Sequence, residues 1–132
     1  LKIERLVLRY IDSVTLDREN TDALDFLRDY LKTRIELQPE LFKDTGVCSV
    51  ASNLDLRFSF PCDKPRGAMN VRFALGNTRG HEALIWETVV QSTGAEAPED
   101  TRQIPAWLEE AHCLTHDWFF KMIEGELQRR FE

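Results

Sequence analysis

The residues best suited to chemistry lie together near the end of the chain, where Glu109, His112, Cys113, His116 and Asp117 follow one another closely. His112 and His116 are four residues apart, so on a helix both imidazoles would lie on one face and could bind the same metal ion. Cys113 follows His112, so the HExxH motif of zinc peptidases is absent. Two histidines alone leave a zinc ion short of its tetrahedral ligand set. The pattern favours a structural role, with His112 and His116 as the candidate metal ligands.

A nucleophilic role for Cys113 is disfavoured by its position. Adjacent residues on a helix do not face each other, so His112 would not lie beside the thiol. Cys113 also lies well inside the predicted helix, away from the N-terminus where a thiol pKa is lowered. The chain has neither a GxxxxGK[ST] phosphate loop nor a GxSxG elbow. We therefore predict no catalytic residue and no cofactor, and the sequence leans away from an enzyme.

Arg9, Arg57 and Arg72 could together line one face of a sheet and bind phosphates or RNA. Asp55 and Glu87 lie among them in the pattern, however, and no aromatic residue is interleaved with them. The net charge of the chain is −6, whereas nucleic acids and anionic membranes select positive surfaces. We therefore expect a solvated face, and neither a nucleic acid nor a membrane as partner.

Length and composition are those of one globular domain spanning residues 1–132, with 42% hydrophobic and 30% charged residues. The three cysteines, an odd and irregularly spaced set, are typical of reduced thiols in the cytoplasm. No apolar run is long enough for a membrane span, and no signal peptide is recognised. The chain begins with Leu1 close to a strand-like run, so we expect it to be the C-terminal domain of a longer protein.

Two segments have the apolar spacing of helices. Residues 104–131 repeat apolar side chains every three or four positions, with Pro105 in the first turn and Gly125 as a weak point. They predict one long helix that would cross the face of a sheet. Residues 21–33 predict a shorter helix capped by Asn20 or Thr21. Between this helix and the next strand, Pro39 and Gly46 interrupt regular structure, and we expect one short helical turn at most.

Four segments alternate as strands do, at residues 2–14, 54–60, 69–75 and 83–91. The first has apolar residues on both faces, which is typical of a strand that is central in the sheet or covered on both sides. The order predicts an α+β fold: a two-layer sandwich with a mostly antiparallel four-stranded sheet and helices on one face, β-α-β-β-β-α. The side chains expected to face the helices are Leu54, Leu56, Phe58, Phe60, Met69, Val71, Phe73 and Leu75. Those expected to face water are Asp55, Arg57, Ser59, Arg72 and Glu87.

The nominally outer face also carries apolar residues, at Val7, Ile11, Ile85 and Val89. An apolar patch beside free sheet edges is typical of an interaction surface. We therefore predict a non-enzymatic interaction domain, whose partner is a second copy, as a homodimer, or an absent N-terminal domain. The alternative is an enzyme domain that binds a metal or small ligand through His112 and His116, in a pocket between the long helix and the sheet.

Three stretches carry a family resemblance: RLVLRYIDSV, TDALDFLRDYL and WLEEAHCLTHDWFFKMIEGELQRRF. Together they resemble the C-terminal region of a family of uncharacterised, sporadically distributed bacterial proteins, whose usual members are longer. Val7 and Asp12 replace a common Gly and Asn, IEGEL replaces ITDEL, and the middle of the chain lacks a DxD-like pair. The shared motifs are packing motifs, so the resemblance implies a bacterial origin and a preceding N-terminal domain but no catalytic residue.

Overall fold

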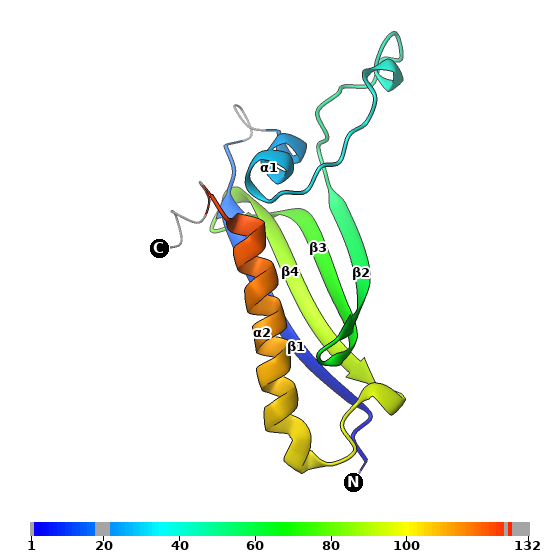
Figure 1. Cartoon of the computed structure of the whole chain (residues 1–132). Coiled ribbons are helices and arrows are strands. Elements are labelled where there is room, and N and C mark those ends of the chain that lie inside the picture. The colour runs from blue at the N-terminus through cyan, green and yellow to red at the C-terminus, as the bar shows by residue number, and fades with distance from the viewer. Residues whose placement is uncertain (1, 18–21, 126, 128–132) are drawn as a thin grey trace.

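Four antiparallel strands form one open sheet in the order β1-β4-β3-β2, and two helices accompany it (Figure 1). The structure is a computed structural model that describes residues 2–17, 22–125 and 127. Its strands and α-helices are β1 (Arg5–Thr15), α1 (Ala23–Tyr30), β2 (Asp55–Asp63), β3 (Arg66–Thr78), β4 (His81–Thr93) and α2 (Ile104–Ile123). The predicted α+β class and the β-α-β-β-β-α order are confirmed.

Short 3₁₀ helices occupy parts of the connections. One spans Pro39–Leu41, in the connection where a short helical turn was expected. Two more, Gly94–Glu96 and Thr101–Gln103, lie in the segment between β4 and α2. Asp100 caps the second of these through a bond from the backbone N–H of Arg102 at 2.6 Å. The chain therefore turns from β4 into α2 through an ordered connection.

The prediction that the first strand is central in the sheet or covered on both sides is wrong for the described residues. Within the described residues β1 pairs with β4 alone, so it forms one edge of the sheet, and β2 forms the other. Alternating residues of β1 face α2, among them Leu6, Leu8 and Tyr10, while Val7 and Ile11 remain exposed on the other face. β1 therefore has apolar residues on both faces, but α2 covers only one of them and the other is exposed.

The core lies between the inner face of the sheet and the two helices. Trp86 and Phe73 from the sheet, Leu27 from α1 and Ile123 from α2 are among the largest fully buried side chains. Met69, Val71 and Phe73 are buried as the alternation predicted, and Leu54, Leu56, Phe58 and Leu75 pack against the core. Phe60 is an exception, being 40% exposed near the β2 edge. The inner face is therefore covered most completely on the β1 and β4 side, where α2 runs (Figure 1).

Polar contacts fix both ends of α2 against the rest of the fold. Near its start, the buried indole N–H of Trp107 donates to the hydroxyl of Ser92 on β4 at 2.9 Å, and that hydroxyl donates to the carbonyl of Arg66. At its end, the ammonium group of Lys32 donates to the carbonyls of Lys121 and Glu124 at 2.6 and 2.9 Å. A cation at a helix C-terminus satisfies carbonyls that lack intrahelical partners. These contacts hold the helix along β1 and β4.

Both helices are shorter than predicted. The first begins at Ala23, with Asp22 accepting a cap bond from the backbone N–H of Leu24 at 2.9 Å. Residues 18–21, including the predicted caps Asn20 and Thr21, lie outside the described residues. It ends at Tyr30, not residue 33, because Lys32 adopts a positive φ of 51°.

The long helix begins at Ile104 as predicted but ends at Ile123, before residue 131. Gly125 follows with φ 112°, a conformation that L side chains rarely adopt, so the helical path is broken there. Residue 126 and residues 128–132 lie outside the described residues. The continuous part of α2, 20 residues long, spans about 30 Å at the usual helical rise.

Candidate functional site

The four apolar residues predicted for interaction lie on the outer face of β1 and β4, where no described helix covers the sheet. Val7 and Ile11 are 41% and 56% exposed, while Ile85 and Val89 are half-buried. The register places Val7 opposite Gln91 and Ile11 opposite Glu87. Val89 lies opposite Arg9 and Ile85 opposite Ser13, so apolar and polar side chains alternate diagonally. The structure therefore brings the four residues into one zigzag patch.

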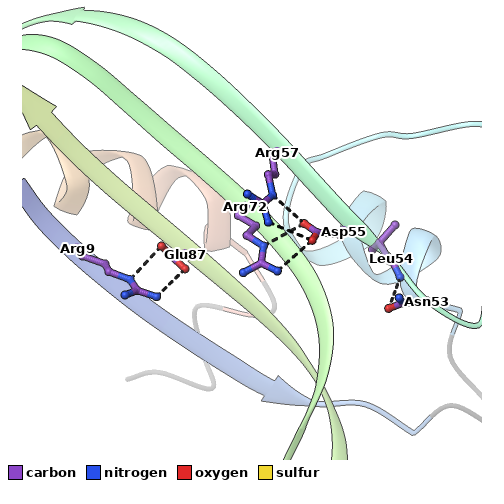
Figure 2. Close-up of polar contacts among 7 residues, drawn as sticks. All are labelled: Arg9, Asn53, Leu54, Asp55, Arg57, Arg72 and Glu87. Carbon is purple, nitrogen blue, oxygen red and sulfur yellow. Dashed lines mark hydrogen bonds and ion pairs between the residues drawn. The ribbon is translucent and has the colours of Figure 1, made fainter.

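Arginine and carboxylate side chains occupy the positions between and beside this patch (Figure 2). Arg9 on β1 pairs with Glu87 on β4 at 2.9 Å. Asp55 on β2 accepts bonds from Arg72 at 3.0 Å and from Arg57 at 3.4 Å. The Arg72 bond, followed by the Arg57 bond, lowers the pKa of Asp55 to about 2. The three arginines predicted to share a face do so, each with a carboxylate partner.

The backbone of β1 leaves a regular row of groups facing away from β4. The N–H of Leu16 donates to the carbonyl of Glu82, and the N–H of Gly94 to that of Glu4, both at 3.0 Å. In an antiparallel pair such bonded positions recur at every second residue. The backbone groups of Val7, Arg9 and Ile11 therefore point toward the open edge. The unbroken register from residue 5 to residue 15 shows no bulge.

The inner side of the same edge is fringed by exposed residues of α2. Leu108, His112, His116 and Phe120 recur at spacings of four and form one row, here named the α2 stripe. Ring centroids are 6.0 Å apart between His112 and His116 and 4.5 Å apart between His116 and Phe120. Tyr10 of β1 lies 6.4 Å from His112 and is 39% exposed. Aromatic and apolar side chains thus flank β1 on its inner side as well.

A cavity of about 200 Å³ opens between the α2 stripe and the inner face of β1 and β4. Its lining is Tyr10, Asp12, Thr88, His112, Thr115, His116, Phe119 and Phe120. The hydroxyl of Thr115 donates to the helix backbone, at 2.9 Å from the Ala111 carbonyl and 3.1 Å from that of His112. Burial raises the pKa of Asp12, whose carboxyl is half-buried. Within the described part of the chain this carboxyl has no hydrogen bond or ion pair.

The structure brings the two predicted metal ligands, His112 and His116, together on one exposed face of α2. His116 Nδ1 lies 3.7 Å from a carboxylate oxygen of Asp117. No group of three or more histidine, cysteine or acidic residues in the described ranges is arranged to hold a metal ion. Metal binding by the pair stays a prediction. Cys113 is exposed beside them as a free thiol.

Sequence reasoning missed Tyr10 and Asp12 as members of a site. A signal was present, since Asp12 shares its face of the strand with Leu6, Leu8 and Tyr10. A carboxyl on the apolar face of a strand is costly to bury without a partner, and it therefore marks a position with another role. The alternation was used to choose the packing face, and the acid within it was overlooked.

The chain matches no family model, no curated protein and no solved structure with which it was compared. Among the described helices, none combines the length and the apolar character that crossing a membrane requires.

Proposed function

We propose that this chain is a non-enzymatic self-association domain, in which two copies pair through the open edge of β1. The observation that carries the proposal is a long, regular edge strand with exposed apolar residues on both sides, Val7 and Ile11 outside and Tyr10 inside. A regular edge with free backbone groups is a template for another strand. Pairing two such edges would satisfy these groups and cover the apolar residues in one step.

A second copy is the partner whose chemistry fits this edge. Closed two-fold pairing is the commonest form of self-association, and it would join the two β1 strands antiparallel. A register centred on Arg9 would oppose two guanidinium groups, and one centred on Asp12 would oppose two carboxyls. A register centred on Ile11 instead places Ile11 against Ile11 and Arg9 opposite Ser13. The side chains thus favour the symmetric register centred on Ile11 over the two that bring like charges together.

The α2 stripe adds to the same interface. A two-fold axis perpendicular to the sheet keeps the helices of both copies on one side, so the two stripes would approach each other across the joined edge. Leu108 and Phe120, 43% and 39% exposed, would then lose solvent contact. Burying apolar area in this way contributes roughly 25 cal/mol per Å² before the cost of association. The helix would therefore support the contact that the strand specifies.

Sedimentation of wild type and Ile11→Glu tests the proposal. We expect wild type to dimerise and the variant to stay monomeric over the same concentrations, because the glutamate would bury an unpaired charge at the centre of the contact. The dimer dissociation constant should rise at least about a hundredfold, which corresponds to roughly 2.7 kcal/mol. Val47→Glu is the matched control, since Val47 is 59% exposed in the connection between α1 and β2. A wild type that stays monomeric, or a dimeric Ile11→Glu, contradicts the proposal.

A reducing compartment such as the cytoplasm forms part of the same proposal. Cys48, Cys62 and Cys113 are all free, and two of them are exposed. Free exposed thiols are usual where thiols are kept reduced. The proposed dimer needs no disulfide, so its mass should be unchanged by a reducing agent.

A further inference from the structure

The cavity beside the α2 stripe contains the Asp12 carboxyl, which forms no hydrogen bond or ion pair with the described part of the fold. Asp12 lies on the inner face of β1, half-buried, and accepts no hydrogen bond there. Its neighbour across the pair is Trp86, which is fully buried. Burying a carboxylate in apolar surroundings costs free energy unless a partner compensates the charge. Burial therefore disfavours the charged form of Asp12, and a cation bound in the cavity would relieve this cost.

The walls of the cavity limit what that partner can be. Tyr10, Phe119 and Phe120 contribute aromatic rings, and the imidazoles of His112 and His116 complete the helix side. Aromatic faces attract cations, and this attraction strengthens where water is excluded. A carboxylate beside aromatic rings is thus the combination that recognises an ammonium group with an apolar body.

We propose that this cavity is a binding site for a small organic cation, with Asp12 pairing with the ammonium group and the aromatic rings enclosing the apolar part. Tyr10 and Phe120 would flank the ligand at the mouth, because both are partly exposed there. Phe119 would form the inner wall, since its ring stacks with Trp86 at a centroid distance of 6.2 Å. The site uses the cavity in which metal binding was predicted, with different chemistry.

Other ligand classes fit these residues less well. An anion would face the Asp12 carboxylate, and the described residues offer no arginine or lysine in the lining. A metal ion would need a ligand group that the described residues do not assemble. The volume of about 200 Å³ is below the roughly 300–1,000 Å³ of pockets for drug-sized ligands, so a single-ring amine suits it.

The test uses three probes of one shape: benzylammonium, the neutral benzyl alcohol and the anionic benzoate. Calorimetric titration into the full chain should show binding of benzylammonium, at least about tenfold weaker binding of the alcohol, and none of benzoate. Equal affinity for the cation and the alcohol would overturn the role of Asp12. Failure of benzylammonium to bind at all would overturn the site.

Substitutions in the lining test whether benzylammonium binds in this cavity. Asp12→Asn keeps the shape of the side chain and removes its charge, so benzylammonium should bind at least about tenfold more weakly. Asp63→Asn makes the same change at the exposed end of β2 and should leave binding unchanged. Phe120→Leu should weaken binding severalfold by removing one ring from the mouth. If Asp12→Asn is folded and binds as wild type does, the proposal is wrong.

The inference does not rest on self-association. Benzylammonium should bind the Ile11→Glu variant at least as tightly as wild type, because Ile11 lies on the opposite face of β1 from the cavity and a monomer leaves Phe120 at the mouth uncovered. Binding by a variant that does not dimerise separates the two proposals. Loss of binding in Ile11→Glu with its fold intact would contradict a site contained in one copy.

Discussion

The two edges of the sheet are built differently, although the same core supports both. β1 runs for 11 residues without a proline or a bulge, and its exposed outer side chains include Val7 and Ile11. β2 runs for 9 residues and carries Pro61. Proline lacks the N–H that a neighbouring strand would need, so it protects an edge against pairing. Within the described residues, the β2 edge is therefore protected against pairing by its proline, and the β1 edge has no such protection.

Exposed apolar area alone does not distinguish the edges. Phe60 of β2 is 40% exposed, about as much as Val7 or Tyr10 of β1. Its ring packs against Trp118 at a centroid distance of 5.7 Å, within the molecule. The difference lies in the backbone and in the outer side chains, since β2 presents Asp55 and Arg57 there (Figure 2), whereas β1 presents Val7 and Ile11 beside Arg9. Self-association is therefore expected at β1 and not at β2.

Removing the proline from β2 should have the largest effect on the oligomeric state. Pro61→Val would restore a backbone N–H to β2 and leave both edges able to pair, so each copy could bind two neighbours. We expect light scattering to show species larger than a dimer, growing with concentration. Adding Ile11→Glu to this variant should limit it to pairing through β2. An unchanged dimer in Pro61→Val would show that proline is not what protects this edge.

Asp55 on β2 and Asp12 on β1 have pKa shifts of opposite direction. Replacing Asp55 should have the larger effect on the melting temperature. Its pKa is about 2 in the fold, against about 3.9 for an unfolded aspartate, so it stabilises the fold above pH 4. That contribution is lost as the pH falls through 2. Asp55→Asn should lower the melting temperature at pH 7 and converge with wild type near pH 2. A constant difference across this range would contradict the ion pairs as its cause.

Replacing Asp12 should change the melting temperature in the opposite direction, and this change should be the smallest of those predicted here. Burial raises its pKa, so the charged form is disfavoured in the fold and costs stability at neutral pH. Asp12→Asn should therefore raise the melting temperature at pH 7, and the gain should shrink as the pH falls below the ordinary aspartate range. Asp63→Asn serves as the exposed control, with no such gain. A less stable Asp12→Asn would show that the carboxylate has a partner that stabilises it.

The order of elements was predictable because helical and strand periodicities are local properties of the sequence. The alternation in residues 54–60 and 69–75 placed the inner and outer side chains of β2 and β3 correctly. Strand order was not predictable, since it depends on pairing between distant segments. Helix ends were misjudged where backbone conformation decides them, as at Lys32 with its positive φ. A positive φ in a residue other than glycine cannot be predicted from the pattern of side chains.

The candidate site was predictable in part. Val7 and Ile11 were identified from their place on the outer face, and the structure leaves both exposed. The spacing of His112 and His116 placed them on one helix face, but it could not show that Asp12 and Tyr10 would meet them across the cavity. That juxtaposition depends on where α2 lies over the sheet, which its polar anchors at both ends determine.

Native mass spectrometry of the untagged chain is the decisive test of self-association through β1, because it reports oligomeric state and bound mass in one spectrum. The proposed function predicts a dimer of the wild-type chain and a monomer of Ile11→Glu under the same conditions. Adding benzylammonium should increase each mass by one ligand per copy. If the wild-type chain is monomeric, and its spectrum is the same as that of Ile11→Glu at every concentration, self-association through β1 is contradicted.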